Sequence, residues 1–219
     1  MSYRTKAVIF DMDGTLVNTD AVTPELEKNM LKDLGVPYTD EFEKEISGLS
    51  IRELYSLIQK KYVPDFSVEK ANKAYADLAK TVYQERSSLM PGAKELIFLL
   101  QRKHIPMAIA SAAPKEWIDM FVKRFEFEET FQHLLSIHSM QLPSKPNPAI
   151  FNEAIQLLNV EPQDTVIFED TARGVQAGKM AGARVVAVPD KRWSFGDFSS
   201  ADLVANTLQD PNIIPFLFS

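Results

Sequence analysis

The sequence predicts a doubly wound α/β fold, in which helices flank a parallel sheet, with a helical domain inserted after the first strand. Short apolar runs rich in valine and isoleucine recur without polar alternation, which is typical of strands buried on both faces of a parallel sheet. Helical patterns lie between the later runs, as strand–helix alternation requires. By contrast, residues 23–89 carry helical patterns and no strand-like run.

The expected elements follow from these patterns. Strands are predicted at residues 7–10, 107–110, 134–137, 166–168, 185–188 and, more weakly, 203–205. Apolar residues at helical spacing predict helices over residues 92–103, 114–125, 148–158 and 172–182.

The helical stretch is interpreted as a cap domain. Its helices are expected at residues 24–34, 40–46, 50–62 and 67–87, with Asp40 and Ser50 as N-caps. We expect a core domain of residues 1–17 and 90–219 and a cap domain of residues 18–89.

Composition narrows the function classes. The 219 residues are 45% hydrophobic and 25% charged, ordinary values for a globular enzyme. The absence of cysteine excludes a disulfide scaffold, a thiol nucleophile and a Cys-ligated zinc site. A net charge of -6 offers no basic field for nucleic acid or an anionic membrane. With no signal-peptide pattern and no apolar run of about 18 residues, we expect a cytoplasmic monomer without nucleic-acid or membrane partners.

The first chemical signal directly follows the first predicted strand. Asp11 and Asp13 stand two positions apart, followed by Gly14 and Thr15. Ligands of parallel α/β sheets bind at the carboxyl ends of strands, so both carboxylates are expected at the functional edge. One can attack while the other holds a proton. Taken alone, the pattern also fits an acidic surface turn.

Four further residues follow later predicted strands. Ser111 and Lys145 offer a hydroxyl and a cation, and Glu169 and Asp170 are adjacent carboxylates that suit a hard divalent cation. Taken one at a time, each has an ordinary structural explanation. Ser111 could be a serine in a turn, Lys145 a solvated lysine, and Glu169-Asp170 an acidic helix N-terminus. Together they meet at one edge of one sheet. Four carboxylates against one lysine would be untenable there unless a divalent cation and a shared proton balanced the charge.

This order of motifs resembles the haloacid-dehalogenase-like (HAD) superfamily. The likeness covers nearly the whole chain and includes Pro91-Gly92, Lys145-Pro146 and Glu169-Asp170-Thr171. Within the superfamily the chain resembles the helical-cap subgroup, and there the relatives that include pseudouridine-monophosphate phosphatases, sugar phosphatases and β-phosphoglucomutase. The resemblance implies a Rossmann-like core, with the cap acting as a lid over the site.

The resemblance also implies a role for each residue. Asp11 would attack phosphorus, and Asp13 would act as general acid and base. Phosphate oxygens would be held by Thr15, Ser111, the N–H of Ala112 and Lys145. Mg²⁺ would be bound by Asp170, the Asp11 carboxylate and the Asp13 main-chain carbonyl, with Glu169 acting directly or through water.

The expected function is Mg²⁺-dependent hydrolysis of a small phosphorylated metabolite, such as a sugar or nucleotide phosphate. Alternatives are a β-phosphoglucomutase-like mutase and an inactive relative that binds a phosphorylated ligand. Carbon–halogen hydrolysis is disfavoured because it needs neither the second acid nor the metal-binding carboxylates.

Overall fold

The computed structural model describes residues 5–46, 49, 51–192 and 194–219. The chain divides into two compact units, one formed by Met1–Asp20 with Ser88–Ser219 and the other by Ala21–Ser87. Within the described ranges, no helix combines the length and the apolar character that crossing a membrane would require.

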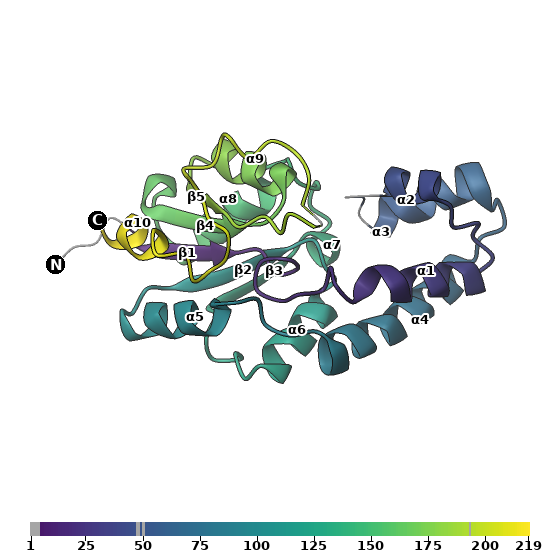
Figure 1. Ribbon diagram of the computed structural model, residues 1–219, viewed down its shortest axis with the longest axis horizontal. Coiled ribbons are helices and arrows are strands. Elements are labelled where there is room, and N and C mark those ends of the chain that lie inside the picture. Colours follow the sequence, from purple (N-terminus) through teal and green to yellow (C-terminus); the bar gives the residue numbers. More distant parts are fainter. Residues whose placement is uncertain (1–4, 47–48, 50, 193) are drawn as a thin grey trace. The chain divides into compact units, whose positions relative to one another are not determined.

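The first unit contains a six-stranded parallel sheet in the order β3-β2-β1-β4-β5-β6 (Figure 1). The strands are β1 (Ala7–Phe10), β2 (Met107–Ser111), β3 (His133–Ser136), β4 (Thr165–Glu169), β5 (Arg184–Ala187) and β6 (Leu203–Val204). Every residue of β1, β2 and β4 is buried, as strands covered on both faces must be. The predicted doubly wound parallel sheet is confirmed.

Helices cover both faces of this sheet. They are α5 (Ala93–Arg102), α6 (Lys115–Arg124), α7 (Ile137–Met140), α8 (Ala149–Leu158), α9 (Ala172–Met180) and α10 (Ile213–Phe218), with a 3₁₀ turn at Pro162–Asp164. In Figure 1, α8 and α9 lie on one face and α5 and α6 on the other. Each long helix buries an apolar stripe, which in α5 includes Leu96, Ile97 and Leu100.

The third strand ends earlier than its apolar run predicts. The expected strand ran through Ile137, but β3 ends at Ser136 and α7 begins at Ile137. The Ser136 hydroxyl oxygen accepts a hydrogen bond from the Ser139 N–H at 3.0 Å. This N-cap starts a helical turn inside the apolar run, so Ile137 is buried by the helix instead of the strand.

The second unit is helical. It contains α1 (Thr23–Asp33), α2 (Asp40–Ile46), α3 (Ile51–Leu57) and α4 (Val68–Ala79), with π-helical turns at Ile58–Tyr62 and Lys80–Arg86. Its core includes Phe42, which packs edge-on against Tyr62 at a centroid distance of 5.0 Å. The expected cap at Asp40 is wrong, because the Thr39 hydroxyl accepts from the Phe42 N–H and Asp40 is already helical. The expected cap at Ser50 lies outside the described residues.

The register of the central strands determines what meets at the carboxyl edge of the sheet. Phe10 pairs with Ile109 of β2 and with Phe168 of β4. The residues that follow these positions, Asp11, Ala110 and Glu169, are therefore neighbours, although Asp11 and Glu169 are 158 positions apart in the chain.

Helix α9 approaches the sheet closely at Gly178. A Cβ placed there would lie 2.8 Å from Val185 Cγ2 and 3.2 Å from Ile167 Cδ1, both on strands beneath the helix. We expect Gly178→Val to lower the free energy of unfolding by about 1–3 kcal/mol, because the added methyl groups overpack this contact. Urea denaturation measures the change. Gln176→Val introduces the same side chain at an exposed position of α9 and should alter stability by less than about 0.5 kcal/mol. Equal effects of the two variants would contradict the packing account.

Candidate active site

Asp11 stands at the carboxyl end of β1. Its N–H donates to the Phe168 carbonyl at 3.0 Å, so the backbone hydrogen bonds of the sheet fix its position. The side chain is mostly buried, with a residue exposure of 7%. Its Oδ1 accepts a hydrogen bond from Lys145, whereas none of the described residues donates to Oδ2. One carboxylate oxygen is therefore held and the other is left for a ligand.

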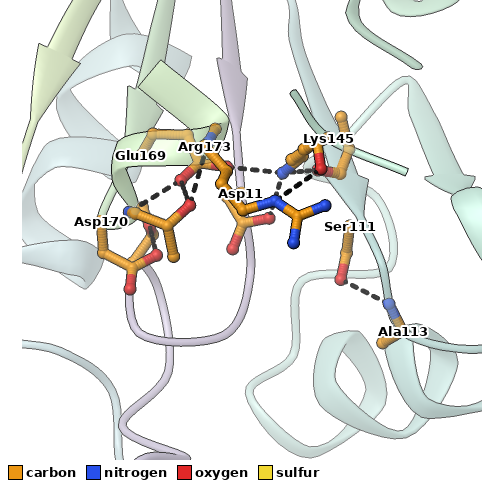
Figure 2. Close-up of polar contacts among 11 residues, drawn as sticks. Asp11, Ser111, Ala113, Lys145, Glu169, Asp170 and Arg173 are labelled. Atoms are coloured by element: carbon orange, nitrogen blue, oxygen red, sulfur yellow. Dashed lines mark hydrogen bonds and ion pairs between the residues drawn. The ribbon is translucent and has the colours of Figure 1, made fainter. Parts of the chain in front are cut away.

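Lys145 joins three strands at this edge (Figure 2). Its Nζ donates to Asp11 Oδ1 and to Glu169 Oε1, both at 2.6 Å, and to the Ala110 carbonyl at 3.2 Å. These acceptors follow β1, end β4 and lie in β2, respectively. An ammonium group has three donors, and each of them has an acceptor here.

Burial and neighbouring charges shift the pKa values of Lys145 and Asp11 in opposite directions. Burial would lower the pKa of Lys145, but Asp11 and Glu169 outweigh it and raise that pKa. Burial raises the pKa of Asp11 to about 8, although the Lys145 ammonium acts to lower it. Burial therefore disfavours the ionised form of Asp11 more than Lys145 favours it, and a further cation would favour that form.

Both carboxylate oxygens of Glu169 are engaged within the core unit. Oε1 accepts from Lys145, and Oε2 accepts from the N–H and the hydroxyl of Thr171 at 3.0 and 2.9 Å. The residue is 1% exposed. A Cβ at Gly174 would lie 1.9 Å from Glu169 Cδ, so α9 can begin against this carboxylate only with glycine there.

Asp170 faces the loop that follows β1. Its Oδ1 accepts from the Thr15 hydroxyl at 3.2 Å and its Oδ2 from the Ser194 hydroxyl at 3.4 Å. Burial first, and then the charges of Glu169 and Asp11, raise the pKa of Asp170 well above its ordinary range. Gly14 has φ +78°, and a Cβ there would lie 2.5 Å from Asp170 Oδ2, so the turn needs glycine for both reasons.

The other expected site residues lie around this cluster. Ser111 ends β2, and its hydroxyl oxygen accepts from the Ala113 N–H at 3.0 Å. Ala112 between them is exposed, and Asp13 is partly exposed in the turn after Asp11. The structure thus brings Asp11, Lys145 and Glu169 into direct contact and joins Thr15 to Asp170. It records no side-chain contact between Ser111 and Lys145 among the described residues.

Sequence reasoning missed Arg173. This residue lies in the first turn of α9, and its Nε donates to the Lys145 carbonyl at 2.9 Å (Figure 2). It therefore holds the backbone of the residue that bridges the carboxylates, and it adds a second cation near them. The sequence does contain a signal for Arg173. It lies four positions after Glu169, at the start of the helix that follows β4.

The donor set fits Mg²⁺, which prefers oxygen ligands and commonly takes one or two carboxylates. Asp11 and Asp170 are buried carboxylates at adjacent strand ends, and their mutual repulsion favours a cation between them. The described residues contain no cluster of three or more acidic or histidine side chains that could hold a metal. The expected magnesium site does not need three such side chains, because its third protein ligand is the main-chain carbonyl of Asp13.

Comparisons with known proteins agree on one family. Residues 8–188 match the family model described as haloacid dehalogenase-like hydrolase. The chain is 30% identical over 177 residues to the "Phosphorylated carbohydrates phosphatase" of Thermotoga maritima, covering 81% of this chain and 82% of that protein. It is also 30% identical over 208 residues to the "Probable pseudouridine-5'-phosphatase" of Drosophila melanogaster, with 92% and 89% covered.

The fold comparison points the same way. The crystal structure of β-phosphoglucomutase from Clostridium difficile matches with a TM-score of 0.77, covering 97% of this chain and 96% of that one, at 22% identity. This likeness supports the fold, and the relatives named phosphatases support a phosphoric monoester hydrolase. The family model spans more than half of the chain, so this protein belongs to the haloacid dehalogenase-like hydrolases.

Proposed function

We propose that this hydrolase removes the phosphoryl group from a small organic phosphate monoester, a sugar or nucleotide phosphate, through a phosphorylated Asp11 and with Mg²⁺. One observation carries the proposal. Lys145 holds Oδ1 of a buried aspartate while Oδ2 accepts no hydrogen bond from the described residues. A nucleophile needs this combination of a fixed orientation and a free oxygen.

In the first step, an Asp11 oxygen bonds to phosphorus while the bond from phosphorus to the ester oxygen breaks. Asp13 donates a proton to that leaving oxygen. Lys145 stabilises charge beside the nucleophile, because its ammonium already contacts Asp11. Ser111 and the N–H of Ala112, at the end of the neighbouring strand, would hold the phosphate oxygens.

In the second step, Asp13 takes a proton from a water molecule that attacks phosphorus. The bond between Asp11 and phosphorus breaks, and Asp11 returns to its carboxylate form. Asp13 thus acts first as an acid and then as a base, which its partial exposure permits because water can reach it.

Asp11, the Asp13 carbonyl and Asp170 would bind Mg²⁺. Bound magnesium would neutralise phosphate oxygens and offset the repulsion among the carboxylates. The Thr15 and Ser194 hydroxyls orient Asp170 for this role.

The relatives narrow the substrate class. Their names specify phosphorylated carbohydrates and pseudouridine 5'-phosphate, both small phosphate monoesters with a polyol or sugar portion. We therefore expect turnover within sugar, polyol and nucleotide monophosphates.

Replacing the nucleophile tests the first step. Asp11→Asn keeps the shape of the side chain and removes its charge, so turnover of an active monophosphate should fall by roughly 10³-fold or more. Circular dichroism should show an intact fold. Asp33→Asn, the same change at an exposed position at the end of α1, should leave turnover unaltered. Activity above a few per cent in Asp11→Asn would rule out this nucleophile.

Metal removal tests the carboxylate site. EDTA should abolish turnover and added Mg²⁺ should restore it, because Asp11 and Asp170 repel each other without a cation. Ca²⁺ should restore it poorly, since its larger and looser coordination does not maintain the geometry of in-line transfer. The measurement is phosphate release after dialysis and metal addition. Full activity of the metal-free protein would contradict the proposed site.

The contacts of Glu169 support a positioning role, in which it holds Lys145 and the turn after β4. Glu169→Gln should lower kcat by about 10- to 100-fold, as changes to residues that support metal ligands commonly do. The Mg²⁺ concentration for half-maximal activity should rise by less than it does when a direct metal ligand is changed, because the carboxylate oxygens of Glu169 contact Lys145 and Thr171.

Asp170→Asn provides the matched comparison, because it removes one charge from the adjacent carboxylate. Its half-maximal Mg²⁺ concentration should rise by about tenfold or more. If Glu169→Gln raised that concentration as much as Asp170→Asn, Glu169 would be a metal ligand, as the family resemblance implies.

A further inference from the structure

The first unit contains a cavity of about 340 Å³ beside the loop that follows Asp11. Thr15 and Asn18 line it from that loop, and Met90 and Pro91 line it from the segment that leads into α5. Residues 188–192, after β5, and residues 206–208 complete the wall. Asp11, Lys145, Glu169 and Asp170 do not line it, so this flank cavity is distinct from the carboxylate cluster.

Its size and apolar wall fit a small organic molecule. Ligand sites in proteins begin at about 300 Å³ and combine apolar walls with a few polar groups. The apolar residues in the wall are Met90, Pro91, Val188, Pro189 and Leu208. Two prolines, a methionine and two branched side chains present carbon surface that suits a ring-sized body.

The polar side chains of the cavity favour an anion. Arg192 binds Asp190 through Nε at 3.0 Å and Nη2 at 2.6 Å, so Asp190 is already neutralised. Lys191 lies between them in the sequence, is exposed, and forms no ion pair with any residue that the structure describes. The local charge of these three residues is therefore positive, and the unpaired charge belongs to Lys191.

Neutral donors add to this preference. Asn18, Asn206 and Thr207 also line the cavity. The Thr207 hydroxyl oxygen accepts from the Gln209 N–H at 3.2 Å, which leaves its proton available to a ligand. Amide N–H and hydroxyl groups next to a lysine suit the oxygens of a carboxylate or a phosphonate.

We propose that the flank cavity binds a small organic anion, with its carboxylate or phosphoryl oxygens at Lys191 and its ring-sized apolar body against Met90, Pro91 and Leu208. This inference does not depend on the proposed reaction. Apart from Thr15, which lines the cavity and contacts Asp170, it concerns residues to which the reaction assigns no role, and binding can be measured without turnover.

An occupant would touch segments that are connected to the carboxylate cluster. Thr15 donates to Asp170, and the loop after β1 pairs with the returning chain through Asn18 N–H to Ser88 carbonyl at 2.8 Å and Met90 N–H to Leu16 carbonyl at 2.9 Å. Binding would thus stabilise the paired arrangement of these two chain segments.

The test is calorimetric titration of the full chain with benzoate, phenylphosphonate and the neutral analogue benzamide. Mg²⁺ and orthovanadate are present throughout, so that the carboxylate cluster is occupied. At least one of the two anions should bind with a Kd on the order of 1–10 mM, as ligands of this size commonly do. Benzamide should bind at least about fivefold more weakly, because it lacks the charge that Lys191 recognises. The stronger of the two anions identifies which group the cavity prefers.

Variants locate the site. Lys191→Glu should weaken anion binding by about tenfold or more, and Asn206→Trp should abolish it by filling the cavity from an exposed position. Lys123→Glu makes the same charge change at an exposed position of α6 and should leave the Kd unaltered. The proposal is overturned if neither anion binds saturably, if benzamide binds as well as the anions, or if Lys191→Glu and Asn206→Trp bind as the unchanged protein does.

Discussion

The site depends on one interaction, the contact of the Lys145 ammonium with Asp11 and Glu169. All three groups are buried, and isolated charges at such positions would be costly. The ammonium compensates both carboxylates and, through the Ala110 carbonyl, joins them to β2. Removing any member would leave uncompensated charge, so the same contact organises the nucleophile, the end of β4 and the turn that leads into α9.

The strand order makes this contact possible. Strand β1 lies between β2 and β4, and Phe10 pairs with a residue of each, so the chain positions beyond them converge at one edge. Two glycines then allow the close approach of the flanking loops. Gly14 lets the turn after Asp11 pass Asp170, and Gly174 lets α9 begin against Glu169. The compensation of charge at this edge therefore depends on the strand order and on the two glycines.

Much of the fold could be predicted because apolar runs report burial on both faces, which is a property of each run itself. The sequence also indicated that Asp11, Lys145 and Glu169 follow strands, since strand ends can be located from the same runs. It did not indicate the N-caps at Thr39 and Ser136, because several neighbouring polar residues could serve. The contacts of Arg173 with Lys145 and of Ser194 with Asp170 join segments that are far apart in the chain. The position of Arg173 after β4 marks it as a candidate, but the partners of both residues depend on tertiary packing.

Reductive trapping tests the central claim, that Asp11 carries the phosphoryl group. The protein is mixed with an active monophosphate and Mg²⁺, quenched in acid within one turnover, and treated with borodeuteride, which reduces an aspartyl phosphate to deuterated homoserine. The peptides are then sequenced by mass spectrometry. The account predicts this conversion at Asp11 and its absence when substrate is withheld. Conversion at another aspartate, or unmodified Asp11 while phosphate is being released in the same sample, would contradict it.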